Sequence, residues 1–555
     1  MQMSISAQEM TVAGEAVGFD AVILGAGIAG LYQLHSLRKL GLRVLVLEAG
    51  DDVGGTWYWN RYPGARCDVE SMSYSYSFSP ELEQEWTWTD RYAKQPEILS
   101  YIRHVADRFD LRRNIRFKTR VAGALYNEDS SQWTLTTEHG DVFTAQFVIM
   151  ATGCLSAAKG PEIPGLDSFR GPTYHTGRWP HTAVDFTGQR VAVIGTGSSG
   201  IQAIPAIAAQ AAHLTVFQRT PNFSIEARHR PLSAGEVAER KKNYGAWRQA
   251  QRHSFFGVPE TPPTKSALEV SPEERDATYE AGWKSGRLNG LLATYTDIFT
   301  DKAANDTAAE FIRSKIRDIV TDPDLAETLS PRTFPYGTKR PCLDDHYYAT
   351  FNRDNVRLVD LRKTPLIEAT SEGLRTSTET FALDCLVFAT GFDALTGALT
   401  AIDIRGRDGL SLKEKWAAGP RSYLGLTTAG FPNLFTITGP LSPSVLSNMM
   451  LSIEQHVEWI TEAIMTVRSQ GDSTIEATDE AEDAWTEHVA EVAAGTLVTS
   501  ADSYYMGSNV PGKARTFMAY IGGVAAYSAK LAQVVAQDYD GFLRSPARIG
   551  EAVAP

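Results

Sequence analysis

The sequence predicts an α/β fold with two similar units of strand, glycine-rich turn and helix, the second inserted into the domain formed by the first. One observation is an apolar run at residues 19–24 that leads into the turn GAGIAG and then into apolar residues at helical spacing. The same order recurs at residues 190–194, which lead into GTGSSG. Two further apolar runs, at residues 147–150 and 385–388, each precede Ala-Thr-Gly and bracket the second unit. Together these patterns indicate one domain that is interrupted by another.

The first unit has the residues of a dinucleotide-binding turn. Gly25 allows the tight turn, Gly27 lets the backbone approach a pyrophosphate at the helix N-terminus, and Gly30 lets helix and strand pack closely. The next apolar run, at residues 44–47, ends in Glu48, whose carboxylate can accept hydrogen bonds from ribose hydroxyls. A carboxylate at this position favours a nucleotide with a free ribose, as in FAD or NAD.

The second unit ends in a cation instead of a carboxylate. Its next apolar run, at residues 214–217, is followed by Gln218, Arg219 and Thr220. Arginine pairs well with a 2′-phosphate through charge-assisted hydrogen bonds. A single glycine-rich turn would be weak evidence, but two copies with different strand ends are hard to dismiss. We therefore predict two Rossmann-like domains, the first for FAD and the second for NADP(H).

The bracketing strands also predict the domain boundaries. The region between residues 221 and 335 is charged and helix-forming, and Ser271-Pro272-Glu273-Glu274 predicts a capping box that opens a helix. We expect the charges of this insertion to form a solvated face. The predicted division is a flexible N-terminus (1–18), an N-terminal segment of the FAD domain (19–153), an NADP domain (154–390) with a helical insertion (221–335), and a C-terminal segment of the FAD domain (391–555).

Composition excludes several classes of function. The net charge of −13 has the wrong sign for binding nucleic acid through the overall field, so an anionic ligand needs a local cationic site. Cys67, Cys154, Cys342 and Cys385 are far apart in sequence, which excludes a zinc site, a redox dithiol and a disulfide framework. The N-terminus lacks a signal-peptide pattern and no apolar run could span a bilayer. We expect a cytoplasmic protein with no metal, membrane or obligate protein partner.

Two longer motifs resemble those of the type I Baeyer-Villiger monooxygenases. Residues 169–180 match F-x-G-x-x-x-H-x-x-x-W-P, and residues 54–68 match G-G-x-W-x-x-x-x-Y-P-G-x-x-x-D. The resemblance extends from about residue 19 into the C-terminal region and is strongest to the phenylacetone and steroid monooxygenase branch. It implies an NADPH- and O₂-dependent flavoprotein monooxygenase of the EC 1.14.13 type, which converts ketones to esters or lactones through a flavin peroxide and also oxidises sulfides.

The resemblance also implies the catalytic residues. A negatively charged peroxide and a developing oxyanion both require a fixed cation in a dry site. Pro341 favours an extended backbone at Arg340, so the side chains of Lys339 and Arg340 point to opposite sides. By the resemblance, Lys339 joins Arg219 at the NADP 2′-phosphate, and Arg340 stabilises the peroxide and the tetrahedral intermediate. Asp68 is implied beside Arg340, where it holds the guanidinium.

Further contacts and two departures follow from the same resemblance. His175 and Trp179 are implied to couple domain movement to catalysis without touching the substrate. Leu441 stands where close relatives have Gly, and Tyr504 replaces a Trp that closes over NADP in a loop near residues 500–515, so cofactor retention, coupling and substrate range are expected to differ. The implied FAD contacts are Thr56, Trp57, Tyr74, Val121 and Met449; the implied NADP contacts are Arg66, Cys67, Thr196, Gly197, Ser198, Ser199, Gly200, Ile201, Thr220 and Tyr504; Asp68 and Arg340 are implied to contact the cofactors as well; the implied ketone-pocket residues are Ser444, Val445 and Leu446.

Two other functions fit the paired nucleotide units. One is a flavin-containing or N-hydroxylating monooxygenase that acts on heteroatoms; Trp179-Pro180 and the complete motif at residues 54–68 favour the Baeyer-Villiger enzyme over it. The other is a non-catalytic flavoprotein that senses the NADP(H) redox state. The presence of Arg340 together with Asp68 argues against a sensor.

Overall fold

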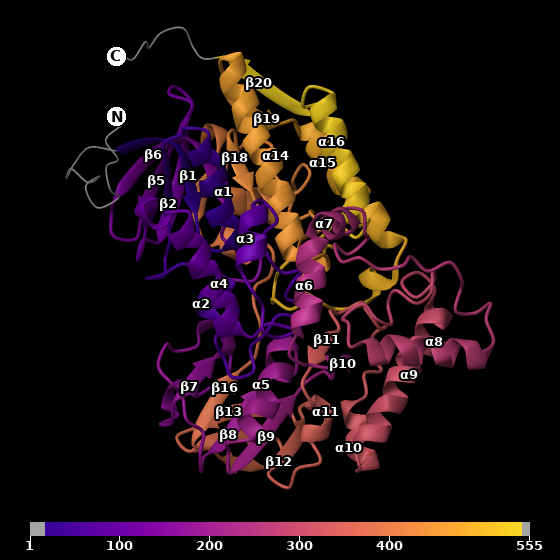
Figure 1. The fold of residues 1–555 in the computed structure, drawn as a ribbon. Coiled ribbons are helices and arrows are strands. Elements are labelled where there is room, and N and C mark those ends of the chain that lie inside the picture. The colour runs from indigo at the N-terminus through magenta and orange to yellow at the C-terminus, as the bar shows by residue number, and fades with distance from the viewer. Residues whose placement is uncertain (1–16, 547–555) are drawn as a thin grey trace.

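The computed structural model describes residues 17–546, and the predicted N-terminal segment up to residue 16 lies outside the described residues. The first strand begins at Val17, two residues before the predicted run. Figure 1 shows two α/β domains, one above the other. The upper domain contains an eight-stranded sheet and the lower domain a five-stranded sheet. The predicted α/β class is confirmed.

The upper sheet combines strands from both ends of the chain. Its order is β17-β4-β5-β6-β1-β2-β3, and β18 pairs with β6. The pairs β1·β2, β1·β6 and β18·β6 are parallel, whereas β4, β5 and β6 form an antiparallel meander. The strands are β1 (Val17–Leu24), β2 (Val44–Leu47), β3 (Ile115–Arg116), β4 (Val121–Asn127), β5 (Gln132–Thr137), β6 (Val142–Met150), β17 (Asp403–Arg405) and β18 (Leu434–Thr436).

Helices cover one face of the upper sheet and bury its apolar side chains. α1 (Ile28–Lys39) packs against α14 (Met449–Gln470), and the residues of both helices belong to one large core cluster. The remaining helices of this half are α2 (Thr56–Trp59), α3 (Pro80–Glu85), α4 (Gln95–Arg108), α12 (Gly397–Thr400), α13 (Leu412–Lys415), α15 (Asp479–Ala494) and α16 (Val524–Ala536), and β19 (Asp472–Ala477) pairs with β20 (Phe542–Pro546).

The lower sheet is entirely parallel and lies within the chain interval between β6 and β17. Its order is β12-β9-β8-β16-β7, so the chain leaves this sheet after β9 and returns to it at β12. The elements are β7 (Thr173–His175), β8 (Arg190–Ile194), α5 (Ser198–Ala208), β9 (His213–Gln218), β12 (Val356–Asp360) and β16 (Cys385–Phe388), with α11 (Tyr347–Thr350) and a small sheet of β13 (Leu366–Thr370), β14 (Gly373–Thr376) and β15 (Thr380–Ala382) beside them.

Besides α11, the segment between β9 and β12 contains five helices and the short parallel pair β10 (Ser224–Glu226) and β11 (Cys342–Asp344). Its helices are α6 (Ala234–Lys242), α7 (Tyr244–Arg252), α8 (Pro272–Ser285), α9 (Lys302–Ile319) and α10 (Pro323–Leu329). α8 begins where predicted, with the Ser271 hydroxyl accepting from the backbone N–H of Glu274. The Glu274 carboxylate pairs with Lys265 at 2.5 Å instead of accepting a hydrogen bond from the Ser271 N–H. Only one of the two bonds of the predicted capping box is therefore present.

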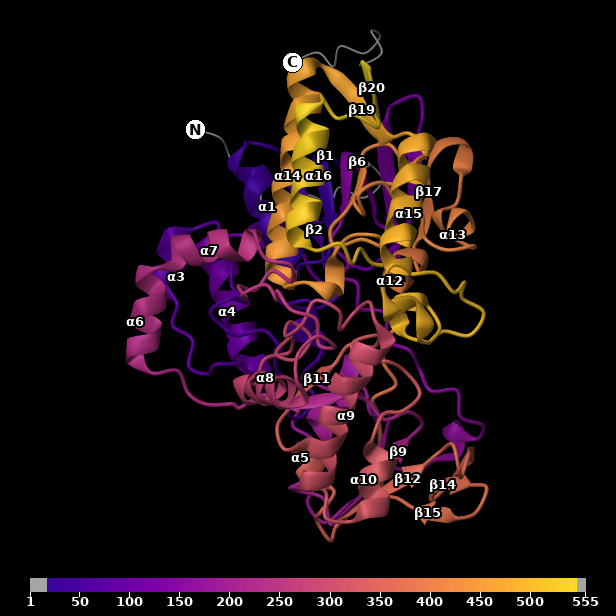
Figure 2. The ribbon, with the colours of Figure 1, turned by 90° about the vertical axis from the view of Figure 1, so that its right-hand side faces the viewer.

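The prediction that the charges of this insertion form a solvated face is wrong for Arg248. Its side chain is 12% exposed and pairs at 2.8 Å with Glu83 of α3, which is 8% exposed. Figure 2 shows α6 and α7 beside α3, on the side of the first domain. The insertion is therefore a bridge to the first domain. Among residues 17–546, no helix is long and apolar enough to cross a membrane.

Candidate active site

The first glycine-rich turn is shaped so tightly that side chains are excluded from it. Gly25 has φ of 107°, and a Cβ there would lie 2.6 Å from the carbonyl oxygen of Ala151. A Cβ on Gly30 would lie 1.8 Å from the carbonyl oxygen of Gly25. No side chain caps the N-terminus of α1 at Gly27, so its first N–H groups are available to an anion. These features fit a bound pyrophosphate.

Parallel pairing brings Glu48 to this turn, because β1 and β2 end side by side at Leu24 and Leu47. The Glu48 carboxylate accepts hydrogen bonds from the backbone N–H groups of Ala26 at 2.6 Å and Gly50 at 2.7 Å. Burial raises the pKa of Glu48, although these bonds work in the opposite direction. Each carboxylate oxygen has a second lone pair for a ribose hydroxyl.

The second turn repeats this geometry but leaves its centre open. Gly195 has φ of 108°, and a Cβ on Gly200 would lie 2.2 Å from the Gly195 carbonyl oxygen. A Cβ on Gly197 would meet nothing within 4 Å, and no side chain caps α5 there. Ile201 is buried behind the turn, and the Ser198 hydroxyl lies 3.2 Å from the Cys342 sulfur. The start of α5 therefore also fits a pyrophosphate.

Two cations lie at the edge of the second unit. Arg219 is exposed at the end of β9, beyond which the Thr220 carbonyl accepts from the Thr196 hydroxyl at 3.0 Å. The Lys339 ammonium lies 4.7 Å from the centre of the Phe334 ring, and burial together with the charge of Arg219 lowers the pKa of Lys339. Within residues 17–546 neither cation has an ion-pair partner. Two neighbouring unpaired cations fit a dianionic phosphate.

The loop at residues 54–68 connects the two domains. A Cβ on Gly64, which has φ of 84°, would lie 2.2 Å from the Gln202 carbonyl oxygen of α5. The Tyr62 hydroxyl donates to Gln202 at 2.8 Å, and the Gln202 amide donates to the Arg66 carbonyl at 3.1 Å. The half-buried Arg66 has a guanidinium nitrogen, Nη1, without a partner among the described residues. The loop thus brings an unsatisfied cation to the side of the second domain.

The same loop begins at the FAD side. Thr56 is the first residue of α2, and the Trp57 indole N–H donates to the Tyr74 hydroxyl at 3.1 Å. Val121 is buried at the start of β4, and Met449 is the first residue of α14. The N-terminus of α14 is capped by Asn448, whose side chain accepts from the Met450 N–H.

Arg340 and Asp68 form the centre of the site, as the resemblance implies. Arg340 donates to Oδ2 of Asp68 through Nη2 at 2.7 Å and through Nε at 3.0 Å. Its Nη1 donates to the Val445 carbonyl at 2.5 Å. Burial opposes the charge, but attraction to Asp68 holds the pKa of Arg340 well above its usual range. The guanidinium is therefore a fixed, permanently charged group.

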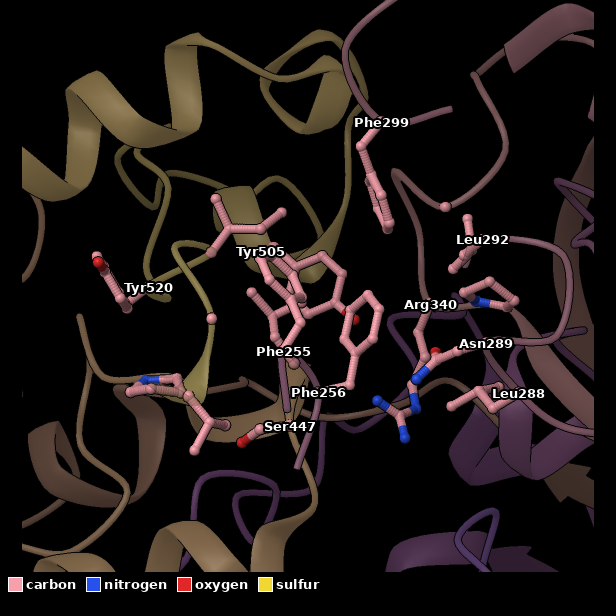
Figure 3. Close-up of a pocket in the computed structure, with 17 residues that line it drawn as sticks. Phe255, Phe256, Leu288, Asn289, Leu292, Phe299, Arg340, Ser447, Tyr505 and Tyr520 are labelled. Carbon is pink, nitrogen blue, oxygen red and sulfur yellow. The ribbon is translucent and has the colours of Figure 1, made fainter. Parts of the chain in front are cut away.

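Arg340 lies in the wall of an apolar cavity with a volume of about 40 Å³. Figure 3 shows its guanidinium below the ring of Phe256 and beside Leu288, at one edge of the aromatic and aliphatic groups. The insertion supplies Phe256, Leu292 and Phe299, and the C-terminal segment supplies Tyr505. None of these four residues was predicted from the sequence to belong to the site. The adjacent aromatic residues Phe255 and Phe256, which follow the polar residues 251–254, were the one signal in the sequence.

The predicted ketone-pocket residues occupy different places. Leu446 lines this cavity. A second cavity lies next to this one, and Ser444 and Val445 line neither of them, since both side chains are buried behind the wall. Ser444 contributes its hydroxyl to the Thr438 carbonyl at 3.4 Å, and Val445 contributes the carbonyl that binds Arg340. Val445 therefore supports Arg340 through its backbone, whereas Ser444 is packed behind the cavity wall.

Leu441 has φ of 68°, the left-handed region in which a Leu costs about 1–2 kcal/mol. Its side chain is 2% exposed, and burying a Leu contributes about 1.5–3 kcal/mol, enough to offset that cost. The Leu441 N–H donates to the Met518 carbonyl, and its carbonyl accepts from the Trp485 indole. The loop thus accommodates Leu in place of Gly.

A buried histidine holds the other end of this loop. His456 Nδ1 accepts from the Thr438 N–H at 2.9 Å, and Nε2 lies 3.0 Å from the Tyr527 hydroxyl. Burial lowers the pKa of His456 to about 3, so the ring is neutral.

Tyr505 of the C-terminal segment borders the cavity, and Tyr504 lies next to it. Their ring centres are 4.3 Å apart, and Tyr505 is 2% exposed. Burial raises the pKa of Tyr505, and the nearby Arg340 opposes that rise. Tyr505 shares the cavity wall with Arg340, whereas Tyr504 lies behind it.

His175 lies outside both cavities, in accord with its omission from the predicted catalytic set. Its Nδ1 accepts from the Gly177 N–H, and its Nε2 lies 3.0 Å from the Lys159 carbonyl and 3.2 Å from the Thr390 hydroxyl. Trp179 is buried in the core of the second domain. This segment is packed between the two connections that join the domains.

Comparisons with known proteins agree with this geometry. A family model described as pyridine nucleotide-disulphide oxidoreductase matches residues 22–244, although all four cysteines of this chain are buried and free. The chain is 42% identical over 531 residues to a Baeyer-Villiger monooxygenase of Pseudooceanicola batsensis, covering 95% of this chain and 96% of that protein. It is 45% identical over 528 residues to a phenazine N-monooxygenase of Lysobacter antibioticus, covering 95% and 97%.

A solved structure described as oxidised steroid monooxygenase bound to NADP superposes with a TM-score of 0.92 at 52% identity, covering 96% of this chain and all of that one. Among residues 17–546, no group of three or more His, Cys, Asp or Glu side chains could hold a metal ion.

Proposed function

The chain belongs to the Baeyer-Villiger monooxygenases, and from that membership we propose how its residues carry out the reaction. It is an NADPH-dependent flavoprotein monooxygenase that converts ketones to esters or lactones, with FAD and NADP as its cofactors. When bound, FAD supplies the redox chemistry that activates O₂, with NADPH as the source of electrons. The protein supplies binding, orientation and electrostatics.

We propose that the domain of residues 19–153 and 391–555 holds FAD and that of residues 154–390 holds NADP. The support is the pair of open helix N-termini at Gly27 and Gly197, with Glu48 beside the first. Arg219 and Lys339 would bind the 2′-phosphate, and the unsatisfied nitrogen of Arg66 would bind another polar group of the nucleotide. The other residues that the family resemblance assigns to FAD or to NADP are proposed to contact the same cofactor here.

The observation that carries the mechanism is the fixation of Arg340. A guanidinium has five N–H donors, and three of them are occupied: two with Asp68 and one with the Val445 carbonyl. The two remaining donors, one on each Nη, belong to the end of the side chain that lines the cavity. There they would stabilise negative charge on the ketone oxygen while the apolar walls exclude water. Asp68 positions the guanidinium and keeps it protonated.

The test is the product formed by Arg340→Ala. The variant should bind FAD and accept electrons from NADPH but give no ester or lactone from linear, aryl, cyclic and steroidal ketones, as measured by mass spectrometry. Arg353→Ala is the matched control, because Arg353 is exposed and its guanidinium contacts Asn355. Normal ester formation by Arg340→Ala would overturn the assignment.

A second activity on heteroatoms is supported by the similarity to the phenazine N-monooxygenase. We propose that sulfides are oxidised in the same apolar cavity, since a sulfide is neutral and less polar than a ketone. Methyl phenyl sulfide should give its sulfoxide, and a tertiary aromatic amine tests N-oxidation. The absence of sulfoxide, with esters formed normally, would restrict the enzyme to ketones.

A further inference from the structure

A second cavity, with a volume of about 70 Å³, lies beside the apolar one. The two cavities are adjacent, because Arg340 and five other residues line both of them: Phe256, Leu288, Asn289, Leu446 and Ser447. Its wall carries more charged side chains than the wall of the first cavity. It is formed by the segment after Asp68, by α7 and by the loop that follows α7.

Most neutral polar groups of that wall are already satisfied within the protein. The Tyr92 hydroxyl donates to the Gly286 carbonyl at 2.7 Å. The Trp247 indole donates to the Ser73 hydroxyl at 3.1 Å, and the Asn448 amide donates to the Ser73 carbonyl at 2.9 Å. These side chains shape the cavity but have little bonding capacity left for a ligand.

The charged groups are also paired, with one exception. Asp68 is bound to Arg340, and Glu70 lies 2.8 Å from Arg91 and 3.4 Å from Arg287. Glu260, in the loop between α7 and α8, has no hydrogen bond or ion pair to any of the described residues. Burial raises the pKa of Glu260 to about 7, the charge of Arg287 lowers it, and that of Glu70 raises it.

Asn289 is the other polar side chain with unused capacity. It lines both cavities, and Figure 3 shows it beside Arg340 on their common wall. Its amide has no hydrogen bond to any residue in the range 17–546.

A partly buried carboxylate without a partner, such as that of Glu260, is costly, and a hydrogen-bond donor on a ligand would remove that cost.

We propose that the second cavity binds the far end of the substrate and that Glu260 selects ketones whose far end carries an ammonium group. The proposal rests on the proposed function, because Arg340 at the common wall binds the carbonyl. Asp68 and Glu70 are bound directly by arginines, whereas the Glu260 carboxylate has no direct partner among the described residues, and its sign favours a cation. Asn289 would accept a hydrogen bond from a polar group between the two ends.

The test uses four ketones that differ only at the far end: octan-2-one, 8-hydroxyoctan-2-one, 8-aminooctan-2-one and 7-oxooctanoate. At pH 8 the holoenzyme should oxidise the amino ketone with a kcat/KM about tenfold above that of octan-2-one, as expected for one charge-assisted hydrogen bond. In Glu260→Gln this ratio should fall to near one, with octan-2-one changed less than twofold. Glu269→Gln is the control, because Glu269 is exposed in the same loop and lines neither cavity.

The pH dependence provides a second readout. Because the pKa of Glu260 is about 7, the ratio of the amino ketone to octan-2-one should decline between pH 8 and pH 6 in the wild type and stay constant in Glu260→Gln. The Kd of the oxidised holoenzyme for the amino ketone, measured by calorimetry without NADPH, should change in parallel.

Two failures are distinguishable. If the wild type forms no ester from octan-2-one or from any other ketone, the proposed function fails. If esters form but the amino ketone shows no preference, or Glu260→Gln leaves the preference unchanged, the second cavity does not recognise cations. A preference for 7-oxooctanoate would also overturn the proposal, since it would assign the recognition to Arg287.

Discussion

The preference for NADPH over NADH should depend unequally on the two cations of the second domain. A charge-assisted hydrogen bond contributes about 1.5–3 kcal/mol when shielded from solvent and about 1 kcal/mol or less when exposed. Lys339 is half-buried over Phe334, whereas Arg219 is exposed. We therefore expect Lys339→Ala to reduce the preference about 10- to 100-fold and Arg219→Ala about fivefold, at about 1.4 kcal/mol for each tenfold change.

The assay is the ratio of kcat/KM for NADPH to that for NADH, measured with a saturating ketone and with the ester quantified. Arg353→Ala again serves as the control. Salt adds a discriminating condition, because it screens exposed charges more than buried ones. The difference between wild type and Arg219→Ala should shrink at about 0.5 M salt, while that of Lys339→Ala persists. An unchanged ratio in both variants would refute the phosphate site, and equal losses for both cofactors would indicate a structural effect.

Two further predictions concern the groups around Arg340. Asp68→Asn leaves the guanidinium with a neutral partner, so ester formation should fall about 10²-fold while reduction of FAD by NADPH persists, a split that stopped-flow absorbance and product analysis resolve. His456→Leu leaves the Thr438 N–H unpaired and removes one of the two hydrogen bonds of the Tyr527 hydroxyl, which keeps its bond to the Leu424 carbonyl; this should cost about 1–3 kcal/mol in the free energy of unfolding, and His456→Gln should recover part of it. Because the pKa of His456 is about 3 in the folded chain and about 6.5 unfolded, its contribution is present above pH 6.5 and declines as the pH falls toward 3. Denaturant titrations that show no difference between the variants and the wild type would contradict this role.

The features that could be predicted best from the sequence are those determined by local geometry. The strand at residues 44–47 has the predicted bounds, and the turns after β1 and β8 contain glycines at positions where the backbone leaves no room for a Cβ. Such constraints act within a few residues, so a spacing of glycines reveals them. The pairing of Asp68 with Arg340, 272 residues apart, was expected only through the family resemblance.

The cavity walls could not be predicted because they depend on how the insertion packs. Phe256 and Leu292 have no periodicity that distinguishes a cavity wall from an ordinary core. In the sequence Arg248 resembles a surface cation, and its ion pair with Glu83 becomes evident only when α7 is packed against α3. Glu260 lies among prolines in a loop without secondary structure, so only the folded chain reveals that it faces the second cavity.

Oxygen insertion itself can be followed in a turnover of the holoenzyme with NADPH, a simple ketone and ¹⁸O₂ in unlabelled water. We expect an ester that contains one ¹⁸O atom per molecule, formed in proportion to the NADPH consumed, with the carbonyl oxygen of the ketone retained. Consumption of NADPH without ester, or an ester that carries no ¹⁸O, would contradict the assignment of this chain as an enzyme that inserts oxygen beside a carbonyl.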